Sequence, residues 1–157
     1  MSSETRYIYA ITLDEASITS RSPPIDHERT VAMNDLIEWN SFSIREFTGP
    51  YAVLIATSEN RISLQVTSQA SPETVTISLI LAPFRSLIRD YFLICESYFD
   101  AVKAGNLPRI EAIDMSRRGL HNEGAELLQG LIADRVQLDS ETSRRLFTLL
   151  CALHLKG

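Results

Sequence analysis

The sequence predicts an α+β fold, in which a small, mainly antiparallel sheet of about four strands packs against about four helices. Between Tyr51 and Leu81, short runs alternate polar and apolar side chains, which is typical of strands. From Pro83 onward, apolar side chains recur every three or four positions, which is typical of helices. A chain of 157 residues is also long enough to bury one core, so residues 1–157 are expected to form a single domain.

The N-terminal part is expected to form one strand and one helix. The run RYIYAITL, residues 6–13, is mostly apolar at both alternating sets of positions, which suits a strand that is covered on both sides. After a loop, Pro23 and Pro24 introduce a segment whose apolar residues recur at helical spacing. We therefore expect an amphipathic helix over residues 24–40 that ends near Asn40, followed by a loop up to Pro50.

Three further strands are expected over residues 51–58, 61–67 and 74–81. The second run alternates apolar Ile62, Leu64 and Val66 with polar residues, so one of its faces should be exposed to water. Because brief turns join the three runs, they are expected to form an antiparallel meander, which the N-terminal strand can join.

The C-terminal half is expected to be helical. Residues 83–105 open with a proline and end at Gly105, a good C-terminal stop. Residues 106–136 form either two helices, with a break at Gly119 and a cap at Asn122, or one continuous helix. The apolar residues keep one register through the whole segment, which favours one helix. The last helix, capped by Asp139, is apolar almost all round, which indicates either a central position or a surface covered by a partner.

The composition argues against several classes of protein. A formal net charge of -5 makes general binding to nucleic acid or to an anionic membrane unlikely, because both require a basic surface. No signal peptide is visible, and the longest apolar stretch, residues 146–155, is too short to span a bilayer, so a cytoplasmic protein is expected. Cys95 and Cys151 lie in apolar patterns without a zinc-like spacing, so we expect no metal and no cofactor.

Of the 15 basic residues, 13 are arginine, since the only lysines are Lys103 and Lys156. Arginine makes planar, bidentate contacts with carboxylates and phosphates, so this bias suits internal ion pairs or an anion site. Genomic base composition is an equally good explanation of the same bias.

The most informative stretch is DMSRRGLHNEGAELL, residues 114–128. On a continuous helix, Arg117 lies in the middle of the apolar stripe, with Asp114 and His121 beside it. A guanidinium that faces a core must be paired, and Asp114 is the nearest candidate partner. Arg118 and Asn122 fall on the outer side, where solvation alone explains them.

Two interpretations of this stretch stay open. In the structural one, Arg117 bridges Asp114 and carbonyls or carboxylates of a neighbouring helix, and His121 is a hydrogen-bonded core histidine. In the functional one, His121 and Asp114 are the catalytic candidates, with His121 as general acid or base, while Arg117, Arg118 and Asn122 are the candidates for binding an anionic ligand.

Two smaller polar clusters have simpler explanations. Asp26 and Glu28 complement the dipole of the first helix, and His27 is expected to face solvent. The run SRR, residues 143–145, is suited to phosphate or to carboxylates of the preceding helix, and surface ion pairing is the favoured interpretation.

Several segments together resemble a known family: ITLDEASI, SPPIDHERTVAMNDLIE, PFRSLIRDYFLICESYFDA, IEAIDMSRRGLHNEGAELL and RRLFTLLCALHLKG. They are similar to an uncharacterised family of small alphaproteobacterial proteins, and the string RRGLHNEG is the most distinctive part. The resemblance implies a cytoplasmic bacterial setting and supplies no catalytic residue. At Leu155 this chain departs from the aromatic residue of the family, so no chemistry is assigned to that position.

The leading hypothesis is a non-enzymatic binding or regulatory protein that forms a homo-oligomer through its apolar last helix. The alternative is an enzyme or small-ligand binder that acts on an anionic metabolite. It is favoured if Arg117 and His121 line an open cleft together with arginines of another helix. Nucleic-acid binding would require Arg85, Arg89, Arg144 and Arg145 to form one face.

Overall fold

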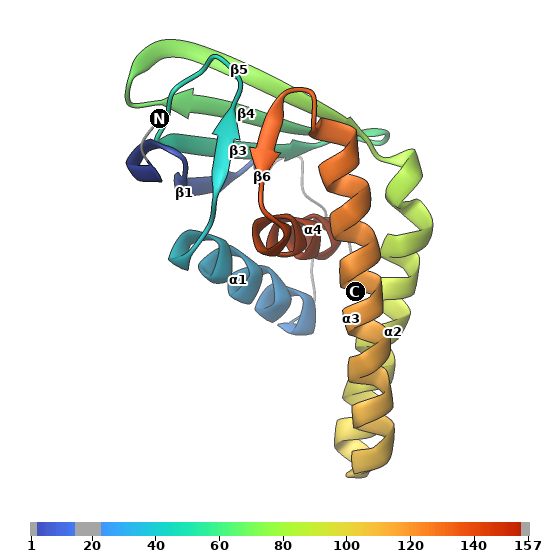
Figure 1. Ribbon diagram of the computed structural model, residues 1–157. Coiled ribbons are helices and arrows are strands. Elements are labelled where there is room, and N and C mark those ends of the chain that lie inside the picture. The colour runs from blue at the N-terminus through green and yellow to red at the C-terminus, as the bar shows by residue number, and fades with distance from the viewer. Residues whose placement is uncertain (1–2, 15–22, 155–157) are drawn as a thin grey trace.

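The computed structural model describes residues 3–14 and 23–154, and within them it confirms the α+β fold (Figure 1). One sheet contains four strands in the order β1-β3-β4-β5. Their bounds are Ile8–Leu13 for β1, Tyr51–Thr57 for β3, Arg61–Ser68 for β4 and Ser71–Ile80 for β5. The strands β3, β4 and β5 form the expected antiparallel meander, and β1 joins its edge in parallel with β3.

The sheet buries one face, as the alternation in β4 predicts. Ile62, Leu64 and Val66 are buried, whereas Gln65 and Thr67, on the opposite face, are exposed. The prediction that the N-terminal strand is covered on both sides is wrong, because Tyr9 of β1 is 40% exposed. This strand lies at the edge of a sheet that helices cover on one face only (Figure 1).

A second, two-stranded sheet was not expected from the sequence. The strands β2 (Phe42–Ile44) and β6 (Val136–Leu138) pair antiparallel across more than half of the chain. Residues 41–50 were expected to form a loop. The strand was missed because three residues are too few to show an alternation and because its pairing partner lies far away in the sequence. We refer to this pair of strands as the ribbon.

Helix α1 spans Pro23–Glu38, close to the predicted range. Asn40 follows it and makes three hydrogen bonds through its side-chain amide. The amide nitrogen donates to the carbonyl oxygens of Leu36 and Ile8, at 2.7 and 3.0 Å, and the amide oxygen accepts from the backbone nitrogen of Ile8 at 2.7 Å. Asn40 therefore both closes the last turn of α1 and attaches it to β1.

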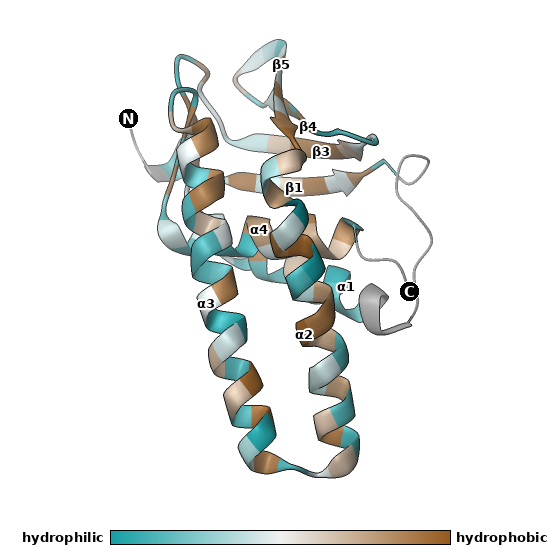
Figure 2. Cartoon of the chain, turned by 90° about the vertical axis from the view of Figure 1, so that its right-hand side faces the viewer, coloured by the Kyte–Doolittle hydropathy of each residue, from teal (hydrophilic) through white to brown (hydrophobic). Residues whose placement is uncertain are grey.

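Helices α2 (Arg85–Ala104) and α3 (Leu107–Ile132) form an antiparallel hairpin. Gly105 ends α2 with a left-handed φ of 66°, and the side chain of Asn106 caps α3 by accepting from the backbone nitrogen of Arg109. As the apolar register favoured, α3 is one continuous helix that passes through Gly119. The outer half of the hairpin extends beyond the rest of the molecule (Figure 2), so Leu107 and Met115 are 69% and 72% exposed.

Helix α4 (Ser140–His154) occupies the centre of the helical layer. The carboxylate of Asp139 accepts from the backbone nitrogen of Thr142, as expected of its cap. Phe147, Leu149 and Cys151 have no exposed surface. The central position therefore explains why α4 is apolar all round, and the argument that a partner subunit covers this helix loses its basis. None of the described helices is long and apolar enough to cross a membrane.

Close contact between α3 and α4 requires a glycine at position 124. A Cβ atom added there would lie 2.3 Å from the ring of Phe147, which is fully buried, whereas a Cβ at Gly119 would meet nothing within 4 Å. The two glycines share one helix but differ in what surrounds them, so they form a matched pair of substitution sites.

We predict opposite effects of alanine at these two positions. Gly124→Ala should lower the free energy of unfolding by about 2 kcal/mol through overpacking, whereas Gly119→Ala should leave it unchanged or raise it by up to about 1 kcal/mol through helix propensity. Urea denaturation of both variants measures the difference. Equal effects of the two substitutions would contradict this account of how α3 packs on α4.

Candidate functional site

Helices α1, α3 and α4 enclose an open cleft of about 430 Å³, which we call the three-helix cleft. Four of the residues singled out in the sequence line it: Asp114, Arg117, Arg118 and His121. Asn122 is exposed on α3 and is not among the lining residues. The remaining lining residues come from α1 and α4: Glu28, Val31, Ala32, Asp35, Glu141, Arg144, Arg145 and Thr148.

Arg117 is paired, but with a carboxylate of another helix. Its Nη2 atom lies 3.1 and 3.2 Å from the two carboxylate oxygens of Glu28 on α1, and both side chains are mostly buried. The expected partner Asp114 lies one turn away on α3 and makes no hydrogen bond with Arg117 within the described chain. The structural interpretation was therefore right that a carboxylate of a neighbouring helix pairs with Arg117. It was wrong that Asp114 is a second partner.

Two tyrosines of α2 complete the surroundings of Arg117. The hydroxyl of Tyr91 donates to Oε2 of Glu28 at 2.9 Å. The guanidinium carbon of Arg117 lies 6.0 Å from the ring centroid of Tyr91 and 5.9 Å from that of Tyr98, within the range of cation–π attraction. Glu28, Tyr91 and Arg117 thus join three helices through one set of contacts, which we call the Glu28 network.

His121 is held by aromatic rings rather than by hydrogen bonds to Asp114. Its ring stacks on Tyr91 at a centroid distance of 5.5 Å and meets Phe147 edge-on at 6.3 Å. Its Nε2 atom is buried and has no hydrogen-bond partner. Burial, together with the positive charges of Arg117 and Arg144, lowers the pKa of His121 to about 4, so the imidazole is neutral at pH 7.

Cys95 lies in the same region and behaves as the expected small hydrophobe. Burial, reinforced by the negative charge of Glu28, raises the pKa of its thiol to about 11. At neutral pH the thiol is therefore protonated and is a poor nucleophile.

The arginines of α4 form the opposite wall. The side chain of Arg145 donates to the carbonyl oxygens of Asp35 and Trp39, at 2.6 and 3.0 Å, and so binds the C-terminal end of α1. Both Arg145 and Arg144 pair with Glu141, at 3.3 and 3.6 Å, which confirms the favoured interpretation of ion pairing. Arg144 retains a buried Nε atom without a hydrogen-bond partner.

The three-helix cleft therefore carries four arginines and four carboxylates. Some of these charges are already paired: Glu28 with Arg117, and Glu141 with Arg144 and Arg145. Within the described residues, the side chains of Arg118 and Asp114 form no ion pair or hydrogen bond, and neither does the carboxylate of Asp35. These groups are free to meet a ligand. Arg85 and Arg89 do not line the cleft, so it does not unite the four arginines considered for nucleic acid.

Sequence reasoning did not identify Glu28 or Tyr91 as parts of the site. Glu28 was explained by the helix dipole alone, although it lies four and eight residues before the buried Ala32 and Leu36 and so shares their face of α1. That spacing was a usable signal that Glu28 points inward. Tyr91 was recognised only as a core residue, because nothing in α2 reveals which acid its hydroxyl meets.

Comparison with known proteins agrees with the resemblance described above. A family model described as "Uncharacterised protein family (UPF0262)" matches residues 5–156. A UPF0262 protein of Rhodospirillum rubrum is 44% identical over 154 residues, covering 98% of this chain and 96% of the relative. A UPF0262 protein of Xanthobacter autotrophicus is 50% identical over 150 residues, covering 94% and 92%. No solved structure matches the chain significantly.

The neutral state of His121 predicts a specific pH dependence of stability. Its pKa is about 4 in the folded protein and near 6.5 when unfolded, so between these values the unfolded chain binds more protons. This contribution to the free energy of unfolding is complete above pH 6.5 and falls, by up to about 3 kcal/mol, as the pH is lowered to 4. His121→Phe retains a ring but cannot titrate, so its stability should fall less over this interval.

Urea denaturation at several pH values measures this difference between wild type and variant. His27→Gln, which removes an exposed histidine, is the matched control and should follow the wild-type curve. Parallel curves for wild type and His121→Phe would show that His121 is not buried in its neutral form.

Proposed function

The chain belongs to the uncharacterised protein family UPF0262, and we propose that it is a binding protein whose three-helix cleft holds a small ligand with at least one anionic group. The observation that carries this proposal is the presence of under-bonded basic groups in an open cleft. Arg144 keeps a buried Nε–H without an acceptor, and Arg118, which is exposed at the mouth of the cleft, has no partner among the described residues. Buried donors in proteins are almost always satisfied, so the missing acceptor at Arg144 points to a ligand.

A carboxylate or phosphate is the natural acceptor for these groups. Arginine presents several N–H donors in a fixed plane that matches the oxygen atoms of such anions. Arg118 extends from α3 and Arg144 from α4, so an anionic group held between them would bridge the two helices. Arg117, in contrast, is occupied by Glu28, and its role is to shape the wall of the cleft.

The acidic residues of the cleft narrow the class of ligand. The carboxylates of Asp114 and Asp35 would repel a simple dianion, but they offer acceptors to an ammonium group. A zwitterion such as an α-amino acid satisfies both sets, with its carboxylate at the arginines and its ammonium at the aspartates. We therefore propose a ligand that carries both charges.

Several observations favour binding over catalysis at this site. A histidine with a pKa of about 4 is a weak base at neutral pH, and no hydrogen bond to Asp114 orients its ring. The thiol of Cys95 is protonated because its pKa is raised to about 11. The proposal follows the small-ligand binder of the alternative sequence hypothesis, and it keeps the non-enzymatic role of the leading hypothesis without its self-association through α4.

The proposal predicts that amino acids bind and that Arg118 is required. Isothermal titration calorimetry with L-glutamate, L-alanine, succinate and inorganic phosphate should show the tightest binding for a zwitterionic amino acid. Arg118→Gln should weaken that binding about 10- to 100-fold, because it removes a charge-assisted hydrogen bond worth about 1.5–3 kcal/mol. Asp114→Asn should weaken the binding of the amino acids but not that of succinate.

Arg89→Gln is the matched control, because Arg89 is exposed on α2 outside the cleft, and it should bind like wild type. Circular dichroism of each variant confirms that it is folded. The proposal is wrong if neither amino acid binds, or if Arg118→Gln binds the amino acids as tightly as wild type.

A further inference from the structure

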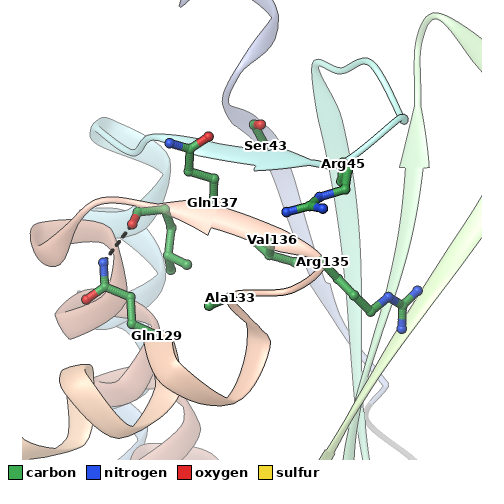
Figure 3. Close-up of a pocket in the computed structure, with 8 residues that line it drawn as sticks. Ser43, Arg45, Gln129, Ala133, Arg135, Val136 and Gln137 are labelled. Carbon is green, nitrogen blue, oxygen red and sulfur yellow. Dashed lines mark hydrogen bonds between the residues drawn. The ribbon is translucent and has the colours of Figure 1, made fainter.

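The ribbon forms a second pocket, of about 470 Å³, that shares no residue with the three-helix cleft (Figure 3). We call it the ribbon pocket. Its lining residues come from the two strands of the ribbon, from the residues next to them and from the end of α3: Ser43, Arg45, Gln129, Ala133, Arg135, Val136, Gln137 and Leu138.

The alternation of the two short strands makes the outer face of the ribbon polar. Phe42 pairs with Leu138 and Ile44 with Val136, and all four of these side chains are buried against the core. The pair between them, Ser43 and Gln137, lies at the intervening position of each strand and therefore faces the opposite side. A hydroxyl and an amide are thus presented next to each other.

The next position along the ribbon brings two arginines together. The backbone nitrogen of Arg45 donates to the carbonyl oxygen of Arg135 at 2.9 Å, so the two residues face each other across the ribbon. Like charges at facing positions are destabilising, and natural sheets usually avoid them. In Figure 3 the side chain of Arg45 leans over the ribbon, whereas that of Arg135 extends in another direction, as expected of two cations that repel each other.

Among the residues that the structure describes, no carboxylate lines the ribbon pocket beside these two arginines. The lining residues of the ribbon pocket include no aspartate or glutamate, in contrast to the four acids of the three-helix cleft. Within the described part of the chain, neither guanidinium forms an ion pair or a hydrogen bond. An uncompensated pair of arginines in a concave surface is suited to an anion with several oxygen atoms, such as a phosphate.

The other lining residues indicate which kind of molecule would carry such a phosphate group. Gln129 is fixed at the edge of the pocket because its Nε2 atom donates to the carbonyl oxygen of Leu138 at 2.8 Å. Ser43, Gln129 and Gln137 are neutral hydrogen-bonding groups, which match hydroxyl groups. No aromatic side chain lines the pocket, so it lacks the surface on which nucleotide bases stack.

We propose that the ribbon pocket binds a small phosphorylated polyol of the sugar phosphate class. The phosphate binds the guanidinium of Arg45, which leans over the ribbon in Figure 3, and Arg135 reaches it by a change of rotamer. The hydroxyl groups of the ligand bond to Ser43 and Gln137. The pocket volume is within the usual range for sites that hold small molecules of this size. This site is independent of the three-helix cleft, and its existence does not depend on what that cleft binds.

The test is calorimetric titration of the full chain with glucose 6-phosphate, with glucose, inorganic phosphate and a short oligothymidylate as comparison ligands. Glucose 6-phosphate should bind, glucose should not, and inorganic phosphate should bind at least tenfold more weakly. Arg45→Gln should weaken the binding of glucose 6-phosphate at least tenfold. Arg89→Gln, on an exposed face of α2, is the control and should bind like wild type.

The variant Arg45→Gln is expected to fold, because its side chain is exposed and the substitution removes a like-charge contact. Its midpoint of thermal unfolding without ligand should equal or exceed that of wild type. The proposal is overturned if glucose 6-phosphate does not bind, if Arg45→Gln binds it normally, or if the oligothymidylate binds more tightly. Loss of binding in Arg118→Gln instead of Arg45→Gln would also overturn it, because it would place the sugar phosphate in the three-helix cleft.

Discussion

One arginine on the apolar face of α3 constrains how the helices assemble. Arg117 occupies a position at which an apolar residue would continue the stripe, and a guanidinium held there without a partner would be too costly. Glu28 of α1 supplies the partner, and Tyr91 of α2 supplies both a hydrogen bond to that carboxylate and a ring beside the guanidinium. These contacts join α1, which packs mainly on α4 and β1, to the α2–α3 hairpin, and the three-helix cleft lies beside them.

The two pockets differ in the charged groups that line them. In the three-helix cleft, burial together with the charges of Arg117 and Arg144 lowers the pKa of His121 and keeps it neutral, so the basic groups available to a ligand are arginines of fixed charge. Acids balance these arginines, which is why the cleft suits a ligand with both charges. The ribbon pocket has arginines without acids and is therefore suited to a different class of ligand. The two sites share no lining residue, and only the three-helix cleft contains acidic residues.

The sequence predicted those features that depend on local patterns. The alternation of β4, the stop at Gly105 and the unbroken register of α3 each follow from residues close together in the chain, and each is present in the structure. The ribbon and the partner of Arg117 were not predictable in this way. The former joins residues 42–44 to 136–138, and the latter joins positions 89 residues apart. The burial of Arg117 required a carboxylate, but no local pattern identifies which helix provides it.

The most direct test of this account is a double-mutant cycle on Glu28 and Arg117. The free energy of unfolding would be measured for wild type, Glu28→Gln, Arg117→Gln and the double variant, with the more exposed pair of Glu141 and Arg144 as a comparison. The account predicts a coupling energy of about 1–3 kcal/mol for the first pair, against about 0.5 kcal/mol or less for the second. Equal, small coupling energies for the two pairs would show that the pairing of Glu28 with Arg117 does not organise the helices.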